Sequence, residues 1–210
     1  MRQRPLAALA ALLALTIGGC SVLREPPAEQ LYRFGGPDGA AARAASVTPG
    51  VRLGIDPGAF PRESAGIRIL TSEGPRVSYL AGSRWAAPAE ILFENALLRA
   101  FDRVGPDVTL YGRGSGAAAQ ALLRTDVTQF EAAYDQGAAA PPMVRVRVSA
   151  RLANRIDRRV LGERDFFAER RAAANSVGEV VVAYDAAIAE LLAAVATWAA
   201  ETARGANLRS

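Results

Sequence analysis

The chain contains, at residues 143–152, the run Met143-Val144-Arg145-Val146-Arg147-Val148-Ser149-Ala150-Arg151-Leu152. From Val144 onward, apolar and polar side chains alternate. Because successive side chains of a β-strand point to opposite faces, this period of two predicts a strand with one buried and one wet face. Residues 120–130 form a second long strand candidate, joined to the first by a hairpin loop at residues 134–142, and residues 159–168 would add a third strand.

The C-terminal segment has a helical period instead. It begins with Ser176-Val177-Gly178-Glu179, a capping box in which the Ser and Glu side chains satisfy free amides of the first turn. Apolar residues then recur at spacings of three and four: Val181, Tyr184, Ile188, Leu191, Val195 and Trp198. This pattern predicts an amphipathic helix of about 26 residues, ~39 Å long. Asp185 and Glu190 lie inside it and its apolar stripe is one-sided, so we predict that it packs against a sheet and does not span a membrane.

Shorter elements precede these. Residues 31–34, 51–55, 67–70 and 76–80 are predicted strands, the last two flanking a turn at residues 72–75. A helix is predicted from about Pro88 to Val104, followed by a strand at residues 107–111. The order predicts an α/β (α+β) fold, with a single mixed β-sheet covered by helices and a long C-terminal amphipathic helix.

The N-terminus resembles the export signal of a bacterial lipoprotein. Arg2 and Arg4 precede an apolar run over residues 6–19, which is shorter than the roughly 20 residues that span a bilayer. The run ends in Ile17-Gly18-Gly19-Cys20, a lipobox. Cys20 is the only cysteine, and a lone thiol is unusual in an oxidising compartment. Lipidation accounts for it better than the alternative, an ordinary signal-cleavage site.

These features predict a domain organisation. Residues 1–19 are a cleaved signal peptide, residues 20–30 the lipidated cysteine and a flexible tether, residues 31–204 the folded domain, and residues 205–210 a disordered tail. The expected covalent group is a diacylglyceryl and N-acyl lipid on Cys20, with no other cofactor. By the sorting rule for such lipoproteins, Ser21 in place of Asp implies the periplasmic face of the outer membrane.

The composition argues against several function classes. The chain has no histidine, which removes the commonest general base, and with Cys20 acylated it has no thiol, so neither an enzyme nor a metal site is expected. Residues 112–116 are glycine-rich but lack a phosphate-loop pattern, and we interpret them as a flexible loop. Glu163 and Asp165 share a strand face, most simply a solvated one. The formal charge of +4 falls to +2 without Arg2 and Arg4, which argues against a nucleic-acid partner.

The polar face of the strand at residues 143–152 carries Arg145, Arg147 and Arg151. One interpretation is that this face recognises lipid phosphates or an acidic partner. The other is that it is the wet side of an antiparallel sheet, with its arginines paired to neighbouring carboxylates. The sequence leaves both open.

Several segments together resemble a known family. They are Tyr32-Arg33-Phe34 soon after the lipobox, Tyr79, Ser83-Arg84-Trp85-Ala86-Ala87-Pro88 at a helix entry, Phe130-Glu131, Phe166 and Trp198. Over about residues 31–200 the chain resembles the ABC-type transport auxiliary lipoproteins, the PqiC-like family. Residues 56–66 depart from the family pattern, because an irregular segment stands where family members carry an aliphatic strand.

The resemblance implies a non-enzymatic outer-membrane subunit of an Mce-type system that moves lipids between the two membranes. Its partners would be the Mce-domain protein, which it docks, with the permease and ATPase of that system. The family fold is also compatible with a homo-oligomer. Arg84 and Trp85 would sit at a strand-to-helix junction, with a structural role first and partner contact second. The alternative function is a stand-alone periplasmic scaffold or regulatory lipoprotein for cell-wall synthesis or secretion.

Overall fold

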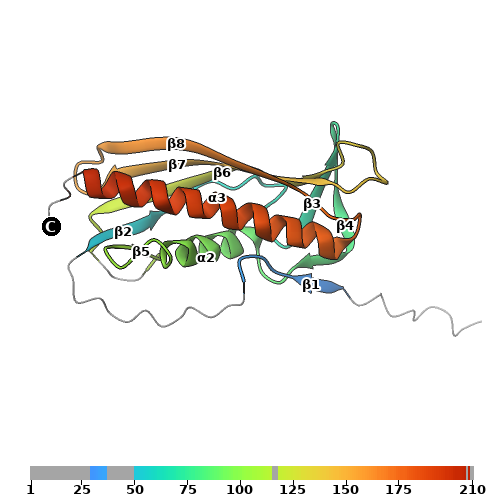
Figure 1. Ribbon diagram of the computed structural model, residues 1–210, viewed down its shortest axis with the longest axis horizontal. Helices are drawn as coiled ribbons and strands as arrows, with labels where there is room; N and C mark the ends of the chain where they lie inside the picture. Colours follow the sequence, from blue (N-terminus) through green and yellow to red (C-terminus); the bar gives the residue numbers. More distant parts are fainter. Residues whose placement is uncertain (1–28, 37–49, 115–117, 207, 209–210) are drawn as a thin grey trace, which may run out of the picture.

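The computed structural model describes residues 29–36, 50–114, 118–206 and 208 (Figure 1). The predicted signal peptide, Cys20 and most of the predicted tether lie outside these residues. The elements within them follow one another as β1 (Gln30–Tyr32), β2 (Val51–Asp56), β3 (Arg68–Glu73), β4 (Arg76–Trp85), α2 (Ala89–Phe101), β5 (Val108–Tyr111), β6 (Ala121–Ala133), β7 (Met143–Asn154), β8 (Val160–Arg171) and α3 (Val177–Gly205).

All eight of these strands join one mixed sheet, which confirms the predicted fold class. The long strand β6 is its centre. On one side β6 pairs with β7 along its length in antiparallel fashion, and β8 pairs with β7 in the same way. These three strands are the meander that the alternating pattern predicts.

The other edge of β6 is shared by two shorter strands. β2 runs parallel to the first residues of β6, and β3 runs parallel to its last residues, Ala132 and Ala133. Between them, residues 57–67 follow the edge of β6 as an irregular segment, tied by a hydrogen bond from the Val127 N–H to the Ala59 carbonyl (2.9 Å). β5 pairs with the free side of β2, and β4 and then β1 continue the sheet beyond β3.

Both helices lie on one face of the sheet, so the domain has two layers (Figure 1). The apolar residues of β7 are buried under α3, as the period of two predicts. Helix α3 is, within the described part of the chain, the one helix long and apolar enough to cross a membrane by length and composition. In the most apolar 18-residue stretch of α3, 56% is buried in the fold, and Ile188 and Leu191 lie in the core. That burial agrees with the predicted packing of α3 against the sheet.

The start of α3 follows the capping box. The Ser176 side chain accepts a hydrogen bond from the Glu179 N–H (3.5 Å), which is the serine half of the predicted capping box. The helix reaches Gly205 and is longer than expected. Beyond it, the Leu208 carbonyl accepts a hydrogen bond from the Gln120 side chain (3.3 Å), so this residue of the predicted tail contacts the domain.

Other boundaries differ from those expected, for local reasons. Helix α2 ends at Phe101, because Arg103 and Val104 close tighter turns on Ala100 and Phe101. β6 continues to Ala133, where β3 pairs with it. The first strand ends at Tyr32, so that Phe34, expected within the strand, instead turns into the core.

Candidate functional site

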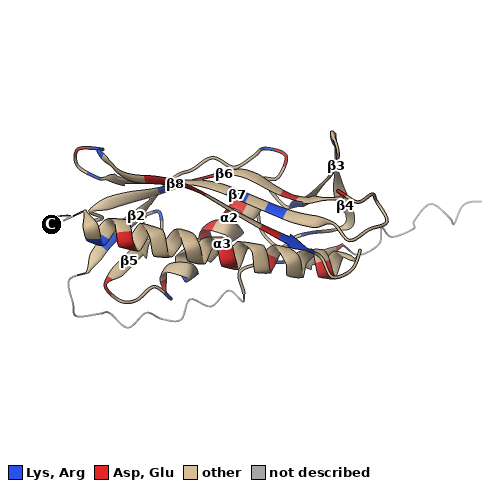
Figure 2. Cartoon of the chain, turned by 45° about the horizontal axis from the view of Figure 1, so that its top comes forward, with Lys and Arg blue, Asp and Glu red and all other residues tan. Residues whose placement is uncertain are grey.

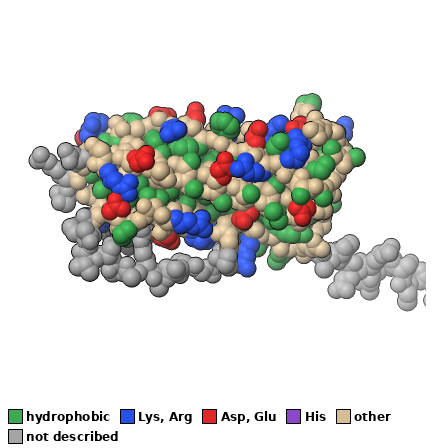
Figure 3. Space-filling view, in the orientation of Figure 1, with side chains coloured by type: hydrophobic (Ala, Val, Ile, Leu, Met, Phe, Trp, Pro, Cys, Tyr) green, Lys and Arg blue, Asp and Glu red, His purple; other side chains and the backbone are tan. Residues whose placement is uncertain are grey.

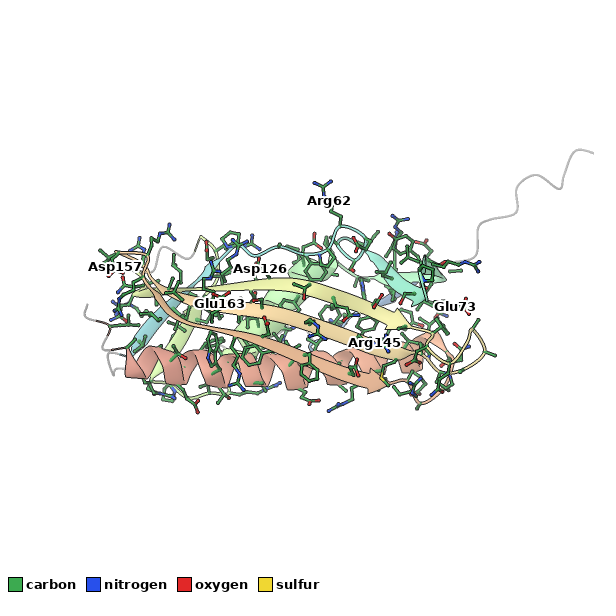
Figure 4. The ribbon with its side chains drawn as sticks, turned by 90° about the horizontal axis from the view of Figure 1, so that it is seen from above. Arg62, Glu73, Asp126, Arg145, Asp157 and Glu163 are labelled. Carbon is green, nitrogen blue, oxygen red and sulfur yellow. The ribbon has the colours of Figure 1, made fainter. Side chains whose placement is uncertain are left out.

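The sheet face opposite the helices carries the predicted arginines. Arg145, Arg147 and Arg151 point from β7, the middle strand of the β6–β8 meander, with β6 on one side and β8 on the other. Figure 2 marks residues of both charges along these strands by colour, and Figure 4 shows Asp126, Arg145 and Glu163 on three neighbouring strands. We call the outward-facing residues of β6, β7 and β8 the open sheet face.

Two of the three arginines pair with carboxylates. Arg145 lies 3.2 Å from Asp135 and 3.3 Å from Glu169, and Arg151 donates two hydrogen bonds to Glu163, both 3.2 Å long. The hydrogen bonds with Glu163 raise the pKa of Arg151 above its ordinary value. This geometry favours the interpretation of a wet, internally paired sheet face for Arg145 and Arg151.

Arg147 is placed differently from its two neighbours. Its guanidinium lies over the ring of Phe167 on β8, 5.6 Å from the ring centroid, in a cation–π arrangement. Phe167 is itself mostly exposed (68%). A hollow beside this pair is lined by Arg147, Gln129, Glu131 and the segment around Glu63. Arg147 is therefore the arginine of this face that is best placed to meet a partner.

A second hollow lies further along the open sheet face. Its lining includes Arg124, Arg151 and Arg158, together with Asp56 and Asp126. Arg124 donates two hydrogen bonds to Asp126, each 2.8 Å long. The hollow therefore holds charges of both signs and resembles an ion-pair network more than a dedicated anion site.

Trp85 and Arg84 lie at the strand-to-helix junction, as expected, but on opposite sides of the chain. Trp85 is 1% exposed, and its ring meets Phe34 and Tyr184 edge to face at centroid distances of 5.0 and 5.3 Å. Arg84 is half-exposed and lies 3.0 Å from Glu29. Trp85 is a core residue, and of the two only Arg84 can reach a partner without unfolding.

The sequence did not reveal the aromatic cluster around Trp85. Phe34, Phe60, Phe130 and Tyr184 come together there from a loop after β1, the irregular segment, β6 and α3. Burial raises the pKa of the Tyr184 hydroxyl well above its ordinary value. No local pattern predicts such contacts, because each partner comes from a distant part of the chain.

The described residues contain no group of three or more Asp, Glu, His or Cys side chains that could hold a metal ion. Glu163 is bonded to Arg151 and faces solvent, in agreement with a solvated face.

The glycine-rich loop at residues 112–116 lies partly outside the described residues. On the face that carries α3, charges of both signs are interspersed (Figure 3).

The comparison with family models decides the family. The model described as "ABC-type transport auxiliary lipoprotein component" matches residues 32–196, from β1 to the later turns of α3. The chain belongs to this family. The family is one of lipoprotein components that assist ABC-type transport, so the resemblance predicted from the sequence is confirmed. A comparison with curated proteins gave no match.

Solved structures share the fold of this family member. Protein XCC0632 from Xanthomonas campestris is 22% identical, with a TM-score of 0.65, over 78% of this chain and 91% of that one. A second structure, described only as an uncharacterized protein, is 16% identical with a TM-score of 0.61, over 80% of this chain and 96% of that one. At these identities the likeness concerns the fold alone.

Proposed function

We propose that the chain is an outer-membrane lipoprotein subunit of an Mce-type ABC transport system that moves lipids between the inner and outer membranes. Its role would be to dock the periplasmic Mce-domain protein, which works with a permease and an ATPase. The observation that carries the proposal is the match of the auxiliary-lipoprotein family over residues 32–196.

The form of the domain supports a docking role. Its two layers enclose one apolar core, while the sheet face opposite the helices is left open and bears Arg147 beside the exposed ring of Phe167. An exposed aromatic next to an arginine is a common composition for the centre of a protein contact. A rigid face of this kind suits recognition of a partner.

The lipobox supports the location. A lipid on Cys20 would hold the domain at a membrane through the predicted tether, of which residues 20–28, before the described part of the chain, reach at most about 30 Å when fully extended. Passage to the outer membrane rests on Ser21 after the cysteine. A homo-oligomer, with which the family fold is compatible, can be tested for by light scattering of the purified mature chain.

A genetic experiment tests the transport role. Loss of the gene should make the envelope more permeable to detergents, and the wild-type gene should restore the barrier. The Cys20→Ala variant should leave the membrane fraction while its domain remains folded, and it should fail to restore the barrier. A soluble Cys20→Ala protein with full activity would count against the anchoring role.

The alternative is a periplasmic scaffold or regulatory lipoprotein for cell-wall synthesis or secretion. The two functions differ in their genetic surroundings. Adjacent genes for a permease, an ATPase and an Mce-domain protein would support the transport role, whereas cell-wall or secretion genes would support the alternative.

A further inference from the structure

The turn between β7 and β8 carries an exposed apolar side chain at its end. Ile156 is 88% exposed, more than any other large hydrophobic residue of the described chain, and Val160 at the start of β8 is also exposed. Single exposed apolar residues are common on protein surfaces, so exposure alone carries no function. The surroundings of Ile156 set it apart, and we call residues 155–160 the apolar tip.

The backbone of the apolar tip is braced by hydrogen bonds. The Asn154 side chain accepts one from the Ile156 N–H (2.8 Å), and the Asn154 N–H donates to the Arg159 carbonyl (2.9 Å). The Asp157 carboxylate accepts from the Arg159 N–H (3.1 Å), and the Arg155 N–H donates to the Gln120 carbonyl (3.0 Å). Ile156 is thus held outward by a preformed turn, which reduces the conformational entropy lost on binding.

Basic residues flank the isoleucine in the sequence of the turn. The tip contains Arg155, Arg158 and Arg159 against one acid, Asp157, so its formal charge is 3 − 1 = +2. Asp157 lies 3.9 Å from the Arg159 guanidinium. Within the described part of the chain, the guanidinium groups of Arg155 and Arg158 have no carboxylate partner. The tip therefore combines an apolar point with cations able to bind phosphate.

The small size of the apolar tip favours a phospholipid surface over a protein as its partner. A stable protein–protein interface buries about 800 Å² on each partner, which a tip of six residues cannot supply alone. A phospholipid surface accepts a small insertion, because apolar side chains enter the boundary of the acyl chains while basic side chains meet the phosphates. We propose that the apolar tip inserts into an anionic phospholipid membrane, as a second attachment besides the predicted lipid on Cys20.

The apolar tip and the predicted tether lie at opposite ends of the domain. Asp157 lies at the end of the long axis opposite to Glu73 (Figure 4), while β1, which follows the predicted tether, lies at the end that carries β3 and β4 (Figure 1). Helix α3 spans about 44 Å between the two ends at 1.5 Å per residue. Attachment at both ends would lay the domain along the membrane. A weak contact suffices, because a short tether keeps the tip at a high local concentration.

The experiment uses the single cysteine as the anchor. The mature chain, residues 20–210, is coupled through Cys20 to a maleimide lipid in vesicles of phosphatidylglycerol mixed with phosphatidylcholine whose acyl chains are brominated. The Ile156→Trp variant adds a fluorophore at the tip, and Val77→Trp adds one at an exposed position of β4 (57%), at the tethered end, where the proposal expects no insertion among the acyl chains. The chain without either substitution gives the background of Trp85 and Trp198.

The proposal predicts that bromine quenches most of the added fluorescence of Ile156→Trp and little of that of Val77→Trp. The quenching should be lost at high salt, on phosphatidylcholine alone, and when Arg155→Glu and Arg159→Glu are added. Equal quenching of the two tryptophans, or none at position 156, would overturn the proposal. It would also be overturned if Ile156→Asp left vesicle contact unchanged but abolished binding of a protein partner, since the tip would then be a protein contact.

Discussion

Tyr184, in the N-terminal third of α3, meets Trp85, at the end of β4, with ring centroids 5.3 Å apart and ring planes at 90°. The hydroxyl of Tyr184 donates a hydrogen bond to the Leu70 carbonyl on β3 (3.4 Å). These contacts join the long helix to the part of the sheet that lies beyond β6. The aromatic cluster therefore connects β3 and β4 to the β6–β8 meander through α3.

Removing the ring at the centre of this cluster should destabilise the domain strongly. Trp85→Ala leaves a cavity among Phe34, Phe130 and Tyr184, and we expect a loss of about 3–5 kcal/mol in the free energy of unfolding. Urea unfolding followed by circular dichroism measures it. Val77→Ala, at an exposed site of the same strand, is the control and should change stability by less than about 0.5 kcal/mol. Similar values for both variants would contradict the role of the cluster.

Substitution by alanine should lower the stability of the domain at Gly58 and raise it at Gly178. A Cβ atom on Gly58 would lie 1.8 Å from the Thr125 carbonyl oxygen on β6, so Gly58→Ala must push residues 57–67 off that edge. We expect it to lose about 1–3 kcal/mol of stability. A Cβ on Gly178, in the first turn of α3, meets nothing within 4 Å, and Gly178→Ala should gain about 0.5–1 kcal/mol. Thermal unfolding measures the stability of both variants. Unchanged stability in Gly58→Ala would mean that residues 57–67 do not lie against β6.

Acid should loosen the same segment. Burial raises the pKa of Asp126, but hydrogen bonds from Arg124 and the Ala59 N–H lower it more, so the pKa of this carboxyl lies below its ordinary value of 3.8. Since the folded-state pKa is the lower one, the stabilisation is complete above the unfolded value and is lost as pH falls through the folded value. The protection of the Ala59 N–H against hydrogen exchange, relative to its intrinsic rate at each pH, should therefore fall below about pH 4.

The control for this pH effect is Asp126→Asn, which removes the titrating group. In that variant, exchange at Ala59 should be faster at neutral pH and should lose the acid-dependent step. An Asp126 pKa at or above 3.8, measured by NMR titration, would show that the bonds from Arg124 and Ala59 are not formed in solution.

Charge reversal on the open sheet face should affect partner binding and stability differently at Arg147 and at Arg145. Arg147→Glu removes a guanidinium whose described contact is the Phe167 ring, so we expect stability to change by less than about 0.5 kcal/mol while binding of the periplasmic partner weakens about tenfold or more. Arg145→Glu breaks contacts with Asp135 and Glu169 and should also lower stability. Arg164→Glu, on the other face of β8, is the control. Unchanged partner binding in Arg147→Glu would leave this face as a solvated surface.

Local patterns predict the elements whose period is long and regular. The alternation that begins at Val144 corresponds to β7 and to the buried Val144, Val146 and Val148, and the capping box at Ser176 marks the start of α3. In each case the residues that determine the element lie within it. The sequence alone was enough for these parts of the fold.

The arrangement of the other strands depends on contacts between distant segments. Nothing near β2 indicates that it lies between β5 and β6, or that β3 takes the far end of the same edge. For the same reason the sequence predicts an arginine face but not its pairing, because Glu163 and Glu169 reach it only through the register of β8. The exposure of Ile156 is likewise a property of the folded turn, since its neighbours in sequence do not reveal it.

The measurement that tests the central claim most directly is affinity purification of the tagged lipoprotein from gently solubilised native envelopes, with partners identified by mass spectrometry. The Arg147→Glu variant, purified in parallel, distinguishes specific partners from background. We expect the wild-type protein to recover an Mce-domain protein with its permease and ATPase. Recovery of only cell-wall or secretion components would contradict the proposed transport role.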